Sequence, residues 1–383
     1  MTETNVRQLF QSKFGREFHL FRAPGRINLI GEHTDYNLGY VLPAAINKYI
    51  YLAIQPNETA TFHIQAADLK EDVSFDTSFH KDTLPAWARY PAGVIRELSN
   101  QGYHLKGFNA VFGGDIPTGA GLSSSAALES AFALALNHIN NLQLKGIELA
   151  RAGQQAEHHT VGVRCGIMDQ FASVFGKANQ LIRLDCRDLG HTYFPFENMD
   201  HTLLLVNTGV RHALADSAYN ERRRQCEEGV RVLAERFPGV ESLRDVSREM
   251  LRIAEKDLDL LVLKRCEFVA EENERVIRTC EALEKGDMDK TGELMWDSHQ
   301  GLRHKYEVSC RELDILVETA GTISGVKGAR MMGGGFGGCT INLLETRCVD
   351  LFKKVTSEKF HNQFQRHPEF YEVTIADGAT HND

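Results

Sequence analysis

The segment 31–36 places five hydrogen-bonding side chains directly after one glycine. Four of them combine pure acceptors with groups that both donate and accept: Glu32, Asp35, His33 and Thr34. In the preceding run, residues 26–30, polar side chains alternate with apolar ones. This pattern predicts a strand that ends at the edge of a site. Such a cluster suits a ligand covered in hydroxyl groups, such as a sugar. From this segment alone, a polar turn that caps the next element is an equal alternative.

A second candidate site is the run of residues 117–127, which is rich in glycine and serine. Gly119 and Gly121 allow the backbone to approach a ligand closely. The serines that follow lead into an alanine-rich helical pattern, whose N-terminus would present unpaired N–H groups to a phosphate. Capping needs only one serine, so we favour phosphate binding, with one hydroxyl available to Mg²⁺. The predicted phosphate-binding residues are Gly119, Ala120, Gly121, Leu122, Ser123, Ser124 and Ser125.

Two other phosphate motifs do not fit the sequence. A P-loop needs Gly-x4-Gly-Lys-Ser/Thr, and residues 176–178 lack both the hydroxyl and the first glycine. The run 333–338 has the glycine spacing of a dinucleotide-binding motif, but it lies near the C-terminus and precedes a predicted strand. The sequence therefore disfavours a dehydrogenase.

Three charged residues are candidates for catalysis or metal binding, and each has an ordinary explanation. Glu157 lies near the end of a helical pattern. Asp169 lies between a glycine turn and an apolar helix start, where a carboxylate commonly caps the helix. Arg26 follows Pro24 and Gly25, and such an arginine usually forms a surface ion pair. None of the three is decisive alone.

The elements that must position these residues are mixed. Strand-like content occupies residues 18–21, 46–54, 61–64 and 108–112, and helical patterns follow at 123–139 and 146–159. Segment 187–200 holds glycine, proline and asparagine and is interpreted as a linker. Beyond it we predict strands at 203–206, 340–344 and 371–375, and helices at 215–237, 260–283, 288–299 and 310–322. Strands and helices in both halves predict an α+β or α/β class.

Composition limits the class of protein. A chain of 383 residues is too long for one typical core, so two domains are expected. The net charge of −9 disfavours nucleic acid or an anionic membrane as a partner. The polar N-terminus lacks the apolar core of a signal peptide, and the most apolar helical stretch is too short to span a bilayer. The eight cysteines contain no CxxC pair, which favours reduced thiols in the cytoplasm.

Taken together, the motifs at residues 24–36, 117–127 and 328–338 resemble those of the GHMP kinase superfamily and, within it, the galactokinase family. Their order and separation fit that family over nearly the whole chain, and the first motif is the most specific. The resemblance implies an α+β fold of two domains with the active site in the cleft between them. Residues 1–190 would form a ribosomal-protein-S5-domain-2-like N-terminal domain, and residues 201–383 a ferredoxin-like α/β C-terminal domain.

The same resemblance implies roles for single residues. Asp169 would be the catalytic aspartate and accept the proton of a sugar hydroxyl, with Arg26 beside it. ATP would lie against residues 119–125, and Ser125 and Glu157 would bind Mg²⁺. The implied sugar contacts are Glu32, His33, Thr34, Asp35, Gly166 and Tyr219.

The activity implied by the resemblance is ATP-dependent phosphorylation of α-D-galactose at its anomeric hydroxyl, which yields galactose 1-phosphate and ADP. One alternative is a kinase for N-acetylgalactosamine, and another is a non-catalytic galactose-binding regulator. Loss of residues from the serine loop would mark a regulator, and residues 123–127 are intact. We expect a cytoplasmic monomer that binds galactose, ATP and Mg²⁺ and has neither nucleic acid nor membrane as a partner.

Overall fold

The computed structural model describes residues 1–117, 119–196, 200–210 and 215–382. A six-stranded sheet of order β13-β1-β3-β6-β4-β5 organises the first half of the chain. Its strands are β1 (His19–Asn28), β3 (Pro43–Pro56), β4 (Phe62–Ala66), β5 (Glu71–Phe75), β6 (Phe108–Gly114) and β13 (Thr380–His381). Only β4 and β6 pair in parallel, and the other neighbours are antiparallel.

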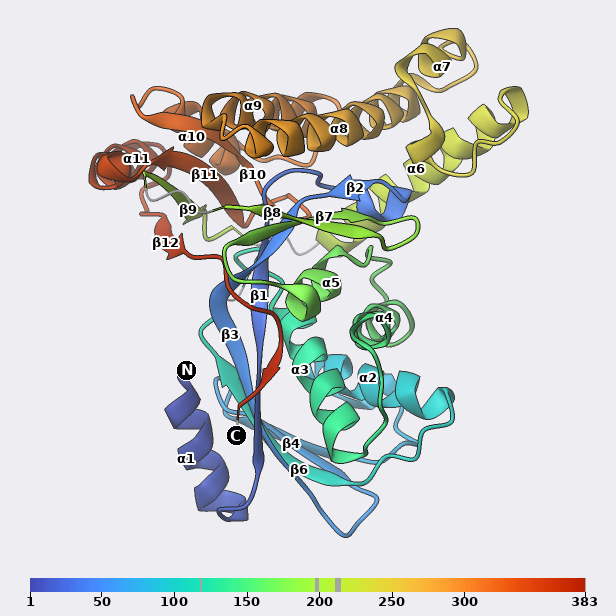
Figure 1. The fold of residues 1–383 in the computed structure, drawn as a ribbon, viewed down its shortest axis with the longest axis vertical. Helices are drawn as coiled ribbons and strands as arrows, with labels where there is room; N and C mark the ends of the chain where they lie inside the picture. Colours follow the sequence, from blue (N-terminus) through green and yellow to red (C-terminus); the bar gives the residue numbers. More distant parts are fainter. Residues whose placement is uncertain (118, 197–199, 211–214, 383) are drawn as a thin grey trace.

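Helices cover both faces of this sheet because successive strand residues point to opposite sides. Leu20 and Ala53 pack with Val6 and Phe10 of α1 (Glu3–Phe14) on one face. Their strand neighbours pack against the other helices, α2 (Arg89–Asn100), α3 (Ser124–Ile139), α4 (Gly146–Ala156) and α5 (Met168–Phe175). Figure 1 shows α1 separated from these four helices, with β1 and β3 between them.

The second half of the chain, in the upper part of Figure 1, is built on an antiparallel sheet of order β10-β11-β9-β12. Its strands are β9 (His201–Asn207), β10 (Val326–Met331), β11 (Cys339–Glu345) and β12 (Glu369–Val373). The accompanying helices are α6 (Ala215–Arg236), α7 (Arg248–Ile253), α8 (Leu260–Glu284), α9 (Met288–His304), α10 (Arg311–Ala320) and α11 (Val349–Phe364). Leu204 and Val206 pack with residues of α10 and α11, whereas Leu203 and Leu205 face the larger core that includes α9.

A small sheet, β2-β7-β8, joins the two halves. It consists of β2 (Tyr40–Val41), β7 (Gln180–Asp185) and β8 (His191–Pro195), and both β2 and β8 contact α8. Strand β8 lies inside segment 187–200, so the segment interpreted as a linker contains regular structure, and residues 197–199 lie outside the described residues. The remaining short helices are η1 (Asp35–Asn37), η2 (Lys81–Thr83), η3 (Ala86–Ala88), η4 (Glu157–Val161), η5 (Leu243–Asp245) and η6 (Thr346–Cys348).

The end of the chain returns to the first sheet. Ile375 forms an isolated bridge with Ile46, and β13 pairs with β1. Figure 1 shows this last segment running down from β12 alongside β1. The domain limits at residues 190 and 201 stay a prediction. If the chain is divided there, β13 belongs by sequence to the second domain but lies in the sheet of the first.

The α+β class predicted from the sequence is confirmed, since both halves mix helices and strands. Most predicted segments correspond to observed elements, but the helices α1, α2, α7 and α11 and the strands β2, β5, β7, β8, β10 and β13 were not predicted. The helix predicted over 146–159 ends at Ala156, and the chain continues as the π-helix η4. Among the described residues, helices with the length and apolarity needed to cross a membrane are lacking.

Candidate active site

Two adjoining cavities lie where the loop before α3 meets the glycine-rich turn after β10. The larger cavity, of about 400 Å³, is lined mainly by residues 121–125 and 332–338. The smaller, of about 160 Å³, is lined mainly by polar side chains from the loop after β1 and from α5 and α6. Because Arg26, Ser125, Gly333 and Gly334 line both, the two cavities meet at these residues.

Arg26 of β1 and Asp169 of α5 form a two-pronged ion pair at this junction. Nε of Arg26 donates to Oδ1 of Asp169 at 2.7 Å, and Nη2 donates to Oδ2 at 2.9 Å. Arg26 is almost fully buried, whereas 29% of the Asp169 side chain is exposed. Burial acts to lower the pKa of Arg26, but the charges of Asp169 and Glu32 outweigh it and raise that pKa. Arg26 therefore stays charged and fixes the carboxylate through charge-assisted hydrogen bonds.

A β-bulge in β1 brings Arg26 to the loop before α3. The register between β1 and β3 shifts between Pro24 and Arg26. A Cβ added to Gly25 would lie 2.7 Å from the carbonyl oxygen of Leu122, and the N–H of Arg26 donates to that same oxygen at 3.1 Å. Nη1 of Arg26 also donates to the carbonyl of Gly121. The bulge thus holds the predicted phosphate loop against β1.

Ser123 enters α3 with a φ of 55°, in the left-handed region that residues other than glycine seldom adopt. Its hydroxyl donates to Oδ2 of Asp169 and makes no capping bond to the helix. Ser124 and Ser125 occupy the first turn of α3 and line the larger cavity together with Gly119, Gly121 and Leu122. Ala120 is buried in the hydrophobic core instead.

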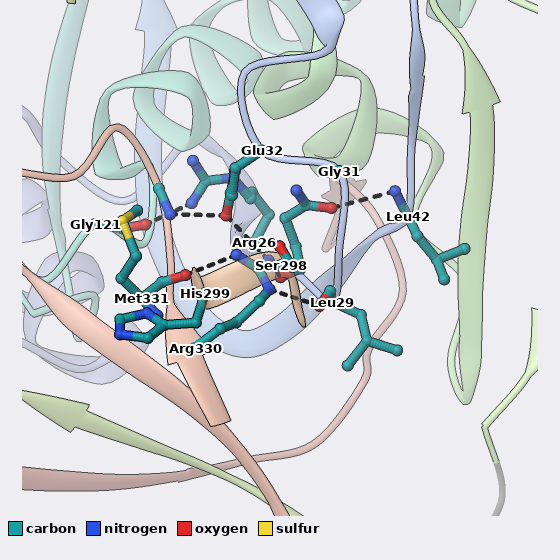
Figure 2. Close-up of polar contacts among 12 residues, drawn as sticks. Arg26, Leu29, Gly31, Glu32, Leu42, Gly121, Ser298, His299, Arg330 and Met331 are labelled. Carbon is teal, nitrogen blue, oxygen red and sulfur yellow. Dashed lines mark hydrogen bonds and ion pairs between the residues drawn. The ribbon is translucent and has the colours of Figure 1, made fainter. Parts of the chain in front are cut away.

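Glu32 is fixed by groups from the second half of the chain. Its Oε1 accepts the N–H of Gly333 at 2.8 Å and Nη2 of Arg330 at 3.1 Å. Arg330 is fully buried on β10, and Nε donates to the carbonyl of Leu29 at 2.8 Å. Figure 2 shows Arg330 reaching both the carboxylate of Glu32 and the backbone of Leu29. This arginine therefore joins β10 to the loop that follows β1.

Helix α8 holds the same loop from its other side. Glu272 accepts the N–H of Gly31 at 3.0 Å and the hydroxyl of Ser298 at 2.7 Å. Asn273 accepts the N–H of Tyr40 at 2.8 Å. The loop is thus supported by helices that follow it by more than 230 residues.

His33 lines the smaller cavity with a φ of 63°. Its Nδ1 lies 2.9 Å from the hydroxyl of Tyr36, which in turn lies 2.7 Å from the hydroxyl of Tyr306. Its Nε2 is buried and meets no hydrogen-bond partner among the residues that the structure describes. Burial, with the positive charge of Arg222, lowers the pKa of His33 to about 3, so its ring is neutral at pH 7. A neutral ring in the lining of this cavity can bond a ligand hydroxyl.

Asp35 lines the same cavity and faces Gly166. Burial and the negative charge of Asp169 raise the pKa of Asp35 to about 7. An added Cβ on Gly166 would lie only 2.0 Å from Oδ2 of Asp35, so no larger residue fits opposite this carboxylate.

Tyr219 and Thr34, both predicted to contact a sugar, are placed differently. Tyr219 lines the smaller cavity, and its ring centroid lies 5.3 Å from that of His33. Thr34 is fully buried, and its hydroxyl donates to the carbonyls of Gly31 and Tyr40. The Thr34 side chain thus shapes the loop from within rather than lining the cavity.

The predicted metal ligands Ser125 and Glu157 both line the smaller cavity. Glu157 is placed by the π-helix η4, a geometry that is frequent at functional sites. A hydroxyl and a carboxylate offer the hard oxygen atoms that Mg²⁺ prefers, so these residues fit that ion. Behind them, Glu129 is fully buried and accepts a hydrogen bond from Gln170 at 2.9 Å. Burial and the charge of Glu157 raise the pKa of Glu129 well above its ordinary value.

Comparisons with known proteins converge on one family. The family model of the galactokinase galactose-binding signature matches residues 8–56. The models of the N-terminal and C-terminal domains of GHMP kinases match residues 89–177 and 280–348. A curated galactokinase from Roseiflexus sp. (strain RS-1) is 40% identical over 375 residues, which covers 98% of this chain and 96% of that protein. The chain belongs to the galactokinase family.

Other similar proteins extend this result. A galactokinase from Thermotoga neapolitana is 41% identical over 358 residues, covering 94% of this chain and 98% of its own. The crystal structure of Lactococcus lactis galactokinase complexed with galactose has a TM-score of 0.94 at 36% identity, covering 98% of this chain and 99% of that one. The mevalonate kinase of Methanococcus jannaschii, at 17% identity and a TM-score of 0.66, shares the fold alone. The two-domain GHMP kinase fold predicted from the sequence is confirmed.

Several residues of this galactokinase-family site were not identified from the sequence. Arg330 and Tyr306 lie behind the cavity lining, and Glu129 and Gln170 lie behind Glu157. Arg330 belongs to the glycine-rich motif 328–338, yet an arginine on a strand gives no signal of burial by itself. Their roles depend on partners up to 302 positions away in sequence, which no local pattern reveals.

Proposed function

We propose that this member of the galactokinase family transfers the γ-phosphoryl group of ATP to the anomeric hydroxyl of α-D-galactose, giving galactose 1-phosphate and ADP. The observation that carries the proposal is the Arg26–Asp169 pair at the junction of two cavities. One cavity is lined by glycines and serines at the start of a helix, and the other by buried polar side chains. A base at this junction would stand between a phosphate donor and a hydroxyl acceptor, as phosphoryl transfer requires.

Asp169 is proposed to accept the proton of the anomeric hydroxyl as that oxygen attacks the phosphoryl group. Arg26 and Ser123 together donate three hydrogen bonds to its carboxylate, which fixes the orientation of Asp169 before any substrate binds. Arg26 lines both cavities, so its positive charge also stabilises negative charge on the group in transfer.

The larger cavity would receive the nucleotide phosphates. The first turn of α3 points its unpaired N–H groups and the positive end of the helix dipole toward this space. Ser125 and Glu157 would hold Mg²⁺, which when bound neutralises phosphate charge. Ser125 lines both cavities, so a metal ligand at this residue would lie beside the reacting groups.

The smaller cavity would receive the sugar. Its proposed hydrogen-bonding groups are Glu32, His33, Asp35 and Tyr219, with Gly166 leaving room beside Asp35 and Thr34 shaping the loop. Galactose and glucose differ in the orientation of one hydroxyl, and a dry polar site rejects a sugar that leaves its groups unpaired. Galactose should therefore be strongly preferred.

We also propose that the protein works in the cytoplasm as a monomer. All eight cysteines are free thiols, as expected in a reducing compartment. The Arg26–Asp169 pair and both proposed metal ligands lie within one chain, so the proposed mechanism uses no residue of a second copy.

A coupled assay of ADP release tests the proposal with galactose, glucose and N-acetylgalactosamine as acceptors. We expect kcat/KM for galactose to exceed that for glucose by roughly 10³- to 10⁴-fold. Equal values for galactose and glucose would indicate a broad sugar kinase. A preference for N-acetylgalactosamine would make that sugar, and not galactose, the substrate. Galactose binding without ADP release would identify a regulator.

A further inference from the structure

Three histidines from distant parts of the sequence meet outside the two cavities. His19 begins β1, His138 lies in the last turn of α3, and His381 lies in β13. Their ring centroids are 4.7 Å apart for His19 and His138, 4.2 Å for His138 and His381, and 5.4 Å for His19 and His381. None of the three lines either cavity of the active site.

The register of the first sheet brings the three rings together. His381 pairs with Phe21 across the β1–β13 ladder, and His19 precedes Phe21 by two positions on the same face of β1. Helix α3 contacts both β1 and β13, and His138 stands at the end of α3. The N–H of Asn382 donates to the carbonyl of Leu20 at 2.8 Å, which fixes this register at the end of the chain.

The three side chains form a donor set suited to a transition metal. Each offers one ring nitrogen, and these nitrogens lie within 4.8 Å of one another. Two imidazole nitrogens on a tetrahedral Zn²⁺ stand about 3.4 Å apart, given Zn–N bonds of about 2.0–2.1 Å, so modest side-chain rotations would close the site. His138 is exposed, so its ring has room to rotate and water can supply a fourth ligand. Among the residues that the structure describes, the cluster holds three imidazoles and no carboxylate, a donor set that suits Zn²⁺ and disfavours Mg²⁺, which prefers oxygen.

We propose that His19, His138 and His381 form a Zn²⁺-binding site that ties the C-terminal strand to β1 and to the end of α3. Strand β13 has only two residues and stands at the sheet edge, where it depends on few backbone hydrogen bonds. A metal shared by three elements would hold this edge in place and stabilise the folded state by binding it selectively.

An ordinary aromatic cluster is the competing explanation. The rings of Phe21 and His381 are stacked, with centroids 4.5 Å apart and an interplanar angle of 14°. Stacking alone requires no metal and predicts no response to Zn²⁺. A measurement of metal binding therefore separates the two explanations, whereas a measurement of stability without metal does not.

Calorimetric titration of the metal-free, full-length protein with ZnCl₂ tests the site directly. We expect one site that is lost, or weakened at least tenfold, in His138→Gln and His381→Gln. His104→Gln is the matched control, because His104 is exposed and outside the cluster, and it should bind Zn²⁺ like the wild type. Zn²⁺ binding that is absent in the wild type, or unchanged in both cluster variants, would overturn the proposal.

Two further measurements keep the test independent of catalysis and of thiols. Zn²⁺ should slow hydrogen exchange in β13 and at the start of β1 in the wild type but not in His138→Gln. Co²⁺ should give the visible spectrum of a tetrahedral nitrogen site. A strong thiolate-to-Co²⁺ band in the near ultraviolet would instead assign the metal to the cysteines and overturn the proposal. Because His138 is exposed, His138→Gln should fold, and a circular dichroism spectrum checks this.

Discussion

Gly166 and Asp35 both line the smaller cavity and lie so close together that a Cβ on Gly166 would be 2.0 Å from Oδ2 of Asp35. The two residues come from the loop before α5 and from the loop after β1, and are 131 positions apart. A glycine at position 166 is therefore required by space and not by backbone conformation, because its φ lies outside the left-handed region.

Gly166→Ala should lower kcat/KM for galactose by at least about 100-fold, since the new methyl group must displace a carboxylate proposed to bind the sugar. Binding of an ATP analogue should change little. Steady-state kinetics and calorimetry with galactose measure both effects. Gly321→Ala is the control, because a Cβ there meets its nearest atom at 3.6 Å and φ is ordinary. Full activity in Gly166→Ala would contradict the placement of Asp35 at the sugar.

Asp169→Asn should remove turnover while largely sparing galactose affinity. The amide keeps the shape of the carboxylate but loses its charge and its basic oxygen, and general-base catalysis typically contributes ~100- to 10,000-fold. Single-turnover kinetics with galactose and ATP measure the loss. Thermal unfolding checks that the variant still folds although buried Arg26 has lost its charged partner. If kcat stayed above about a tenth of the wild-type value, Asp169 would not be the base.

Asp35→Asn should stabilise the protein at pH 8 while weakening galactose binding. The pKa of Asp35 rises from 3.8 to about 7 on folding, so the folded state holds a proton that the unfolded state releases between about pH 4 and pH 7. The stability of the wild type therefore falls as the pH rises through this window. At pH 8 the variant should gain about 1–4 kcal/mol, and the gain should vanish near pH 4. Chemical denaturation at several pH values measures it, and a gain that does not depend on pH would disprove the mechanism.

Arg330→Met should destabilise the protein by about 3–5 kcal/mol, because it leaves Glu32 and the carbonyl of Leu29 buried without their charged donor. The double variant Arg330→Met, Glu32→Gln should recover part of this loss, since the buried charge disappears. Thermal unfolding of the two single variants and the double variant forms a thermodynamic cycle. Additive losses would show that the ion pair does not couple the two halves.

Ser125→Ala and Glu157→Ala should each weaken binding of a non-hydrolysable ATP analogue in Mg²⁺, because each would remove an oxygen ligand of the ion. Galactose affinity should change far less. Titrations at several Mg²⁺ concentrations give the measurement. Ser124→Ala is the comparison, because Ser124 lines the nucleotide cavity but is not a proposed metal ligand, so this variant should keep the Mg²⁺ dependence of the wild type even if its affinity falls. Wild-type Mg²⁺ dependence in both variants would remove these residues from the metal site.

The sequence by itself determined the family, and most of the site residues that it predicted line the two cavities. Local sequence patterns predicted helix α3, the serine loop before it and the polar segment after β1. The types of side chain and the spacing of glycines can be read from neighbouring residues alone. The same patterns could not show that Ser123 donates to Asp169 rather than capping α3, since Asp169 lies 46 positions away in the sequence and only the fold brings it to Ser123.

The tertiary structure alone decided which residues support the site and how they are charged. The burial of Arg330 beside Glu32, the approach of Gly166 to Asp35 and the raised pKa of Asp35 all arise from contacts between segments far apart in the chain. The same holds for the three histidines, which the return of β13 to β1 brings together. Desolvation and close packing depend on what surrounds a residue in space, and a linear sequence does not state its neighbours.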